Sequence, residues 1–157
     1  MKLSLAIGVS NYNTTHLDEI KEAGMPLPSV NQVEFNPSHG LDAKPCTPSL
    51  KGVAGETCGE LLEYCRANSI VFNGYAPYGG AGGAGKTLGD PRLAPIAKAH
   101  NVSSAQVVLA WQWAKGIPTN SEAVSTVYQH ENLDIFSFTL SPSEIAVLDN
   151  WNKKGGE

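Results

Sequence analysis

The sequence predicts an α/β fold built on a parallel sheet, and two observations carry this prediction. Short runs rich in β-branched and aromatic residues alternate along the chain with longer amphipathic runs, and capping motifs mark where several of the longer runs begin. The alternation gives about four strand–helix units and a further C-terminal helix. It therefore predicts a partial (β/α)8 barrel, in a single domain of residues 1–157.

The first half of the sequence predicts two strands, one helix and a long loop. The apolar run 3–9 predicts a strand, and Thr15, followed three positions later by an acidic residue, approximates a capping box for a helix that ends at Gly24. Residues 30–35 predict the second strand. The next stretch, 37–55, is rich in Gly, Pro and Ser and is longer than most loops, so we interpret it as an insertion.

The second half of the sequence continues the alternation. Thr57 begins a capping box and a second helix, and residues 70–75 predict the third strand. A glycine-rich loop follows, and then a helical region with a second capping box at Ser103. Residues 117–118 predict a short fourth strand, and Ser141, with Pro directly after it, begins the last helix. Four strands leave the first and the fourth without an outer neighbour, so we expect another copy, another chain or an unusual closure to cover these edges.

Composition and charge exclude several classes of function. The chain has 11 basic and 15 acidic residues without a basic cluster, so nucleic acid is not an expected partner. No apolar run is long enough to cross a membrane, and we expect a cytoplasmic protein. The cysteines, Cys46, Cys58 and Cys65, are odd in number and lack C-x-x-C spacing, and no two histidines have the spacing of metal ligands. We therefore expect reduced thiols and no metal site.

The glycine-rich loop contains a nucleotide-binding pattern. Residues Gly80–Thr87 fit G-x-x-x-x-G-K-S/T, in which backbone amides and a lysine bind phosphates. Such a loop must open directly into a helix, but Gly89 and Pro91 would end a helix before its second turn. A P-loop that binds ATP or GTP is therefore the least favoured interpretation. The glycines could instead lie against a cofactor pyrophosphate or form a flexible surface loop.

Six fragments of the sequence resemble a known family. IGVSNYN, VNQVEFNP, LLEYCRANSI, GYAPYG, DPRLAPIAKAHNVSSAQVVLAWQWAKGI and ENLDIFSFTLSPSEIAVLDNWN resemble, in order, the C-terminal half of aldo-keto reductases. The resemblance covers nearly the whole chain apart from 37–55. It implies a (β/α)8 barrel that binds NADP(H) at the C-terminal ends of its strands and reduces aldehydes or ketones. The first strand here would be the family's fifth.

The resemblance also implies which residues bind the cofactor. Ser10, Asn11 and Gln32 match residues that hydrogen-bond the nicotinamide carboxamide, and Tyr75 matches the aromatic residue that stacks on the nicotinamide ring. The complete implied set is Ser10, Asn11, Gln32, Tyr75, Gly79, Asn120, Glu131 and Asn132. The alternative for the residues assigned to the nicotinamide is that Ser10 and Asn11 form a strand-end turn and Tyr75 belongs to the core.

The sequence departs from the family's pattern at the 2′-phosphate of the cofactor. Thr119 and Tyr128 stand where the family has a Lys and an Arg, while Glu131 and Asn132 match the pair that contacts adenine. Without the two cations, a phosphate that relies on charge-assisted bonds should bind more weakly. We therefore expect NADP(H) as the cofactor, with NAD(H) accepted more readily than in the family.

A second departure concerns catalysis. In the family, the catalytic Asp, Tyr, Lys and His lie in strand–helix units that have no counterpart in this sequence, so we assign no catalytic residue. We expect a truncated form that is inactive or nearly so by itself, with a small carbonyl substrate only if the missing half is supplied. The alternative is a non-catalytic module that binds a dinucleotide or associates with itself through its strand edges.

Overall fold

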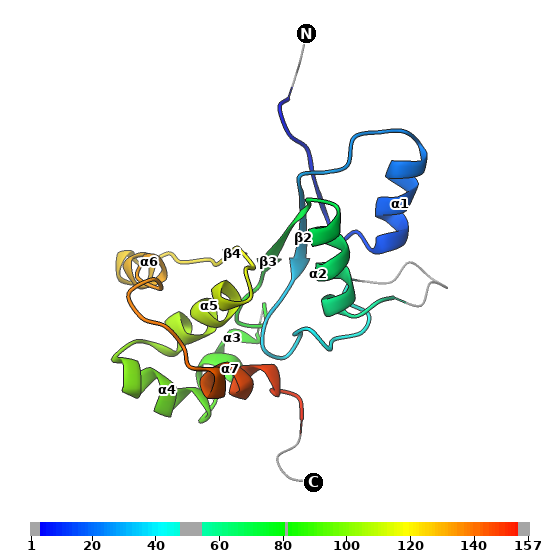
Figure 1. Cartoon of the computed structure of the whole chain (residues 1–157). Helices are drawn as coiled ribbons and strands as arrows, with labels where there is room; N and C mark the ends of the chain where they lie inside the picture. Colours follow the sequence, from blue (N-terminus) through cyan, green and yellow to red (C-terminus); the bar gives the residue numbers. More distant parts are fainter. Residues whose placement is uncertain (1–3, 48–54, 81, 154–157) are drawn as a thin grey trace.

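The computed structural model describes residues 4–47, 55–80 and 82–153. Within these ranges four strands form a parallel sheet in the order β1-β2-β3-β4, which confirms the predicted architecture (Figure 1). The strands are β1 (Gly8–Ser10), β2 (Val30–Glu34), β3 (Val71–Tyr75) and β4 (Thr119–Asn120). The helices are α1 (Thr14–Glu22), α2 (Cys58–Ala67), α3 (Ala84–Leu88), α4 (Leu93–His100), α5 (Ser104–Ala114), α6 (Thr126–Leu133) and α7 (Pro142–Asp149).

The register of the sheet brings the strand ends together. Ser10 pairs with Gln32, Gln32 pairs with Asn73 on β3, and Tyr75 pairs with Asn120 at the end of β4. Because all four strands run in the same direction, their C-terminal ends lie at one edge of the sheet. Polar residues from four separate segments of the sequence therefore meet at this edge.

Two strands differ from their predicted bounds. β1 begins at Gly8, and the apolar residues before it lie in water, with Leu5 95% and Ile7 51% exposed; Leu3 lies outside the described residues. The strand is short because it pairs only with β2, which itself begins at Val30. β4 begins two residues after the predicted 117–118. There Ile117 is buried and its backbone N–H closes the end of α5 by donating to the carbonyl of Gln112.

The helix boundaries follow local capping. Capping boxes at Thr57, Ser103 and Ser141 are present as predicted, each with its reciprocal pair of side-chain to backbone hydrogen bonds. The predicted cap of α1 at Thr15 is wrong. Asn13 caps this helix, because its Oδ1 accepts from the His16 N–H at 2.9 Å while His16 Nδ1 accepts from the Asn13 N–H at 3.2 Å. The sequence did not predict α6, which has no buried residue and so lacks an apolar stripe.

The sheet buries one face and leaves the other partly open. Buried and half-exposed residues alternate along β2 and β3, so that Val33 and Phe72 join the core while Gln32 and Tyr75 lie on the opposite face. Val71, on the same open face, is 47% exposed. The polar strand-end residues therefore stand on the face that the core does not occupy.

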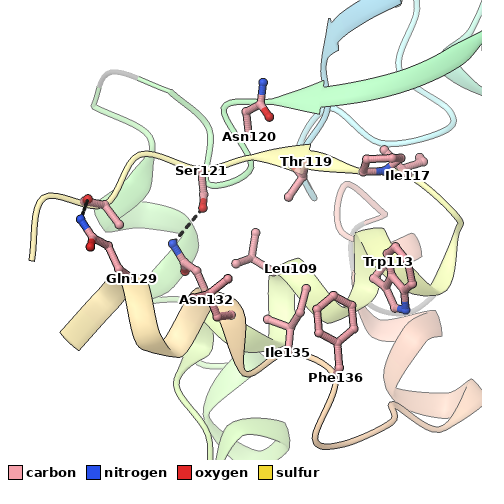
Figure 2. A pocket seen from close by; sticks show the side chains of 13 residues that line it. Leu109, Trp113, Ile117, Thr119, Asn120, Ser121, Gln129, Asn132, Ile135 and Phe136 are labelled. Carbon is pink, nitrogen blue, oxygen red and sulfur yellow. Dashed lines mark hydrogen bonds between the residues drawn. The ribbon is translucent and has the colours of Figure 1, made fainter. Parts of the chain in front are cut away.

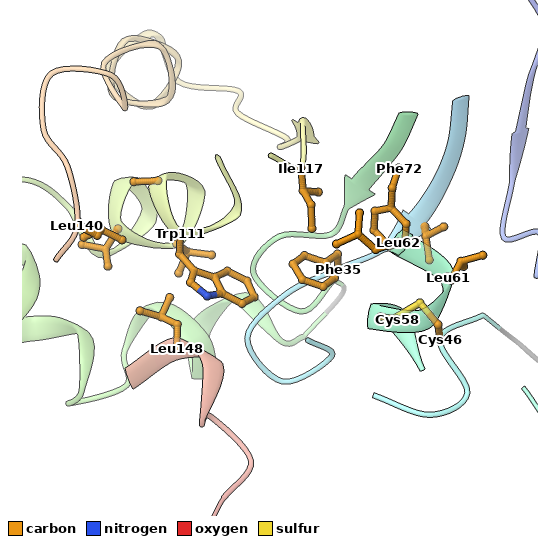
Figure 3. Packing of buried hydrophobic residues seen from close by; sticks show 14 of the residues in the cluster. Phe35, Cys46, Cys58, Leu61, Leu62, Phe72, Trp111, Ile117, Leu140 and Leu148 are labelled. Atoms are coloured by element: carbon orange, nitrogen blue, oxygen red, sulfur yellow. A yellow bond between two sulfur atoms is a disulfide. The ribbon is translucent and has the colours of Figure 1, made fainter. Parts of the chain in front are cut away.

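Aromatic packing joins the strands to the helices. The ring of Phe35, directly after β2, stacks on Trp111 of α5 with centroids 5.1 Å apart (Figure 3). Phe72 meets the Phe35 ring edge-on, with centroids 5.9 Å apart. The Nε1–H of Trp111 donates to Asp149 Oδ1 at 2.8 Å, which ties α5 to the end of α7. Trp111 is 1% exposed and belongs to the buried core.

The cysteines do not have the predicted state. Cys46 and Cys58 form a disulfide with Cα atoms 4.5 Å apart (Figure 3), so the prediction of three reduced thiols is wrong. Their separation of 12 residues carried no signal of contact; the loop after β2 folds back onto the start of α2. Cys65 is a buried thiol, and burial raises its pKa to about 11. The predicted insertion 37–55 begins in this loop, but residues 48–54 lie outside the described part.

Both outer edges of the sheet are open within the described residues. No strand there pairs with the outer side of β1 or of β4. Among the described helices, none combines the length and apolar character that crossing a bilayer requires.

Candidate functional site

Four predicted residues meet at the C-terminal ends of β1, β2 and β3. Ser10 Oγ donates to the Gln32 carbonyl at 3.0 Å, and the Asn11 N–H donates to the same oxygen at 2.9 Å. Tyr75 Oη donates to Asn11 Oδ1 at 3.3 Å, and Gln32 Nε2 donates to Asn73 Oδ1 at 2.9 Å. We call Ser10, Asn11, Gln32 and Tyr75 the strand-end cluster. Its hydroxyl and amide groups can both donate and accept hydrogen bonds.

A buried residue that the sequence did not single out holds this cluster in place. Asn31 is 0% exposed, and its side chain accepts from the Tyr12 N–H at 3.3 Å and donates to the Tyr12 carbonyl at 2.7 Å. These bonds fix the turn between β1 and α1. Asn11, just before Tyr12, has φ of 58°, a left-handed conformation that Asn tolerates better than most residues.

A groove continues from the end of β3 toward α6. It has two adjoining parts, of about 570 and about 380 Å³, which share Tyr78, Ala84, Glu122 and Tyr128 as lining residues. The larger part reaches Asn120, which pairs with Tyr75 in the sheet. The strand-end cluster and the groove therefore lie along the same edge of the sheet.

The remaining predicted residues lie in or behind this groove. Glu131 and Asn132 line its smaller part, and Asn120 lines the larger one. Gly80 lines the groove directly, while Gly79 shapes the turn with φ of +94°.

Tyr78 lines the groove, although the sequence predicted no role for it in the site. Its hydroxyl lies 3.5 Å from Asn132 Oδ1, and Asn132 Nδ2 donates to Ser121 Oγ at 2.9 Å (Figure 2). Burial raises the pKa of Tyr78 to about 12, and the charge of Glu131 adds to the effect. The phenol is therefore neutral at physiological pH. Only the folding of α6 against the glycine-rich loop brings these side chains together, so no local pattern could have indicated Tyr78.

The glycine-rich loop does not have the geometry of a P-loop. α3 has five residues and ends at Leu88 with Gly89 as its C-cap, so it is as short as the sequence predicted, and Ala81 lies outside the described residues. The N–H groups of Gly79 and Gly83 donate to loop carbonyls, those of Ala76 and Gly80, at 2.9 and 3.1 Å. These two amides are therefore used inside the loop instead of pointing together at an anion.

An apolar trough lies on the other side of β4. It measures about 700 Å³ and includes side chains from α5 and from the segment after α6 (Figure 2). Trp113 and Phe136 meet edge-to-face there with ring centroids 5.1 Å apart, although they are 53% and 63% exposed. Two large aromatic rings in water beside an open strand edge are typical of a surface that another part of a protein covers.

Comparison with known proteins gives consistent results. Residues 4–153 match the model of the aldo/keto reductase family. The chain is 34% identical over 148 residues to glyoxal reductase of Bacillus subtilis, covering 94% of this chain and 46% of that protein. It is 35% identical over 153 residues to morphine 6-dehydrogenase of Pseudomonas putida, covering 92% and 46%.

Solved structures agree with the sequence relatives. A variant of Gox0644 in complex with NADPH matches with a TM-score of 0.76 and 27% identity, covering 97% of this chain and 49% of that one. An aldo-keto reductase from a Medee basin deep-sea metagenome library gives a TM-score of 0.76 and 27% identity, covering 97% and 50%. The chain thus spans about half the length of the relatives that it matches.

Proposed function

Because the chain belongs to the aldo/keto reductase family, we propose that it forms the dinucleotide-binding part of a reductase that acts on aldehydes or ketones. When bound, the dinucleotide supplies the hydride for such a reduction. The observation that carries the proposal is the strand-end cluster, which lies along one edge of the sheet with the groove at Tyr78. A structural neighbour that was solved with NADPH supports it.

The strand-end cluster fits a nicotinamide carboxamide, which has one acceptor and one donor group. Gln32 uses its Nε2 for Asn73, and Asn11 uses its Oδ1 for Tyr75. We therefore assign Gln32 Oε1 as acceptor and Asn11 Nδ2 as donor toward the carboxamide. Ser10 Oγ completes the set, and the Tyr75 ring, held by its bond to Asn11, supplies the stacking surface.

The groove fits the adenosine end of the cofactor. Glu131 and Asn132 offer oxygen atoms to the amino group of an adenine, and Tyr78 lies beside them with a neutral phenol. The adjoining part of the groove, lined by Gly80 and Asn120, connects this end with the strand-end cluster. Gly79 would contribute to cofactor binding through the shape of its turn.

The groove gives little reason to prefer a 2′-phosphate. Thr119 Oγ1 donates to the Gly74 carbonyl at 3.1 Å and so serves the sheet, and Tyr128 carries no charge that would attract a phosphate. We propose that NADPH and NADH bind with dissociation constants within about tenfold of each other, since no charge-assisted bond at these two positions separates them. Titration of both cofactors tests this, and a much larger preference for NADPH would contradict it.

Reduction of a carbonyl also needs a general acid. Near the site, Tyr75 and Tyr78 are the candidates, but their hydroxyls are directed to Asn11 and Asn132, and the pKa of Tyr78 is raised to about 12. We assign neither as proton donor. The 157-residue polypeptide by itself is therefore expected to bind the dinucleotide and not to turn over a carbonyl substrate.

The deciding experiment is a titration with NADPH followed by tryptophan quenching, with ATP as a control ligand. Gln32→Leu should weaken binding by about 2- to 13-fold, the worth of one hydrogen bond of 0.5–1.5 kcal/mol. Asn68→Leu is the matched control, because it removes a similar amide at the end of α2, before β3 begins. Absence of saturable binding by either dinucleotide would refute the proposal, and binding of ATP alone would favour the P-loop interpretation.

The second candidate is a self-associating module, and the open sheet edges favour it. Leu5 and Ile7 beside β1, and Trp113 and Phe136 beside β4, expose large apolar side chains that association would bury. We expect the purified chain to form homo-oligomers. Light scattering after gel filtration measures the mass, and a monomer at all concentrations with a sharp melting transition would contradict this candidate.

We also propose a cytoplasmic location, where NADP(H) and NAD(H) are available to a reductase. The Cys46–Cys58 disulfide makes the location testable through the redox state of these cysteines, because disulfides are uncommon in reducing compartments. Fractionation of cells that express the chain, with the thiols alkylated at lysis, gives both the compartment and the redox state. Recovery in a secreted fraction would contradict the proposal.

A further inference from the structure

Three side chains able to bind a metal meet beside the first turn of α2. A ring nitrogen of His39 and the sulfur atoms of Cys46 and Cys58 all lie within 4.8 Å of one another. Cys46 is 2% and Cys58 0% exposed, and His39 is partly buried. We call these residues the His–Cys–Cys cluster. It is separate from the strand-end cluster and from the groove.

Backbone hydrogen bonds hold the two cysteines together independently of the bond between their sulfurs. The N–H of Cys46 donates to the Glu56 carbonyl at 3.0 Å, and the N–H of Cys58 donates to the Ala43 carbonyl at 3.1 Å. These bonds join the segment before Cys46 to the segment that leads into α2. Breaking the disulfide would therefore leave the two cysteine backbones side by side, while the sulfur atoms move apart from bonding distance by rotation of their side chains.

His39 is fixed by a buried turn. Its backbone N–H donates to the carbonyl and to the Oδ1 of Asn36, at 2.9 and 3.0 Å, and Asn36 is 1% exposed. One ring nitrogen, Nε2, lies 2.9 Å from the Cys46 carbonyl, which orients the imidazole toward the cysteine backbone. The backbones of all three residues and the imidazole of His39 are thus held in place without a ligand.

The chemistry of the cluster depends on its redox state. Sulfur in a disulfide carries no charge and is a poor ligand, whereas two thiolates and one imidazole form a set that suits Zn²⁺. Cys58 is also the first residue of α2, a ten-residue helix whose N-terminal dipole favours a thiolate. Three protein ligands leave a fourth tetrahedral position for water.

We propose that the His–Cys–Cys cluster is a redox-gated zinc site. In the oxidised form the disulfide closes it. A dithiol opens it by exchange: the dithiol loses two electrons and two protons and becomes a disulfide, while the Cys46–Cys58 bond breaks and both sulfurs become thiols. One Zn²⁺ then displaces the two thiol protons into the solvent and takes His39 as its third protein ligand.

The test uses the full chain in both redox states. The protein is reduced with a phosphine, which becomes the phosphine oxide with an oxygen atom from water, and is then desalted without oxygen. Co²⁺ serves as a coloured probe for the zinc position. Thiolate-to-cobalt charge-transfer absorption should saturate at one equivalent in the reduced protein, disappear when Zn²⁺ is added, and be absent from the oxidised protein. Absence of these bands from the reduced protein, or their presence in both states, would overturn the proposal.

Variants identify the ligands. Cys46→Ser and Cys58→Ser should each lower the charge-transfer intensity, and His39→Gln should weaken cobalt binding by more than the roughly 10–100-fold typical of losing an outer-shell partner. Cys65→Ala is the matched control, since this thiol lies outside the cluster, and it should leave the titration unchanged. Loss of the bands in Cys65→Ala with their retention in Cys46→Ser would refute the assignment. Should a serine variant fail to fold, the comparison of the oxidised and reduced protein decides by itself.

Discussion

Reduction of the Cys46–Cys58 disulfide is expected to lower the free energy of unfolding by about 3 kcal/mol, the loop-closure value for a separation of 12 residues at 25 °C. The effect arises mainly in the unfolded chain, which gains conformational freedom once the cross-link is broken. The native state should change little, because the backbone bonds from Cys46 to Glu56 and from Cys58 to Ala43 remain. For a protein of this size, the melting temperature should fall by about 6–12 °C.

Urea denaturation with and without a phosphine reductant measures this difference, with a metal chelator present so that the reduced site stays empty. The double variant Cys46→Ser/Cys58→Ser is the control, since its stability should not respond to the reductant. In a parallel sample without the chelator, free Zn²⁺ at about 100 times its dissociation constant should restore about 2.7 kcal/mol to the reduced wild type and nothing to the double variant. Equal stability of the oxidised and reduced proteins would refute the loop-closure argument, and restoration in the double variant would place the metal elsewhere.

Three further changes test the packing of the C-terminal helix. Ser141→Ala removes the cap of α7 and should cost about 1 kcal/mol in urea denaturation; an unchanged midpoint would contradict the capping box. Hydrogen bonds from Ser141 lower the pKa of Glu144 below its usual 4.5. The ionised Glu144 therefore contributes stability above pH 4.5, and this contribution is lost as the pH falls through the lowered pKa of the folded protein. Glu144→Gln should flatten this part of the pH–stability curve. Trp111→Phe keeps an aromatic ring but loses the bond to Asp149, and should destabilise the protein by about 1.5–3 kcal/mol, whereas no loss would mean that the bond is not formed in solution.

Much of the fold could be predicted because its signals are local. A capping box occupies four consecutive residues, so Thr57, Ser103 and Ser141 indicated their helices directly, and the alternation of strand and helix runs indicated a parallel sheet. The failures have local causes as well. Asn13 competed with Thr15 for the start of α1. α6 has no buried face, so its sequence lacks the helical periodicity of apolar residues that would indicate a helix.

The candidate site also has a part that the sequence could predict and a part that it could not. The residues of the strand-end cluster lie within strands or, for Asn11, directly after one, so sequence fragments could assign them, and the register of the sheet brings them together. Tyr78 meets Asn132 across 54 positions of sequence, a contact that no short pattern encodes. The cofactor roles of both groups stay predictions until binding is measured.

The sequence by itself determined the alternation of elements, the helix caps and the family resemblance, because each depends on neighbouring residues or on short fragments in order. Only the tertiary structure decided which distant side chains share a space. His39, Cys46 and Cys58 lack metal-ligand spacing along the chain, yet they meet because a buried turn at Asn36 and backbone bonds to the start of α2 fold the loop back on itself. The spacing along a chain limits what local structure can form, whereas the distance between side chains is set by the packing of the whole domain.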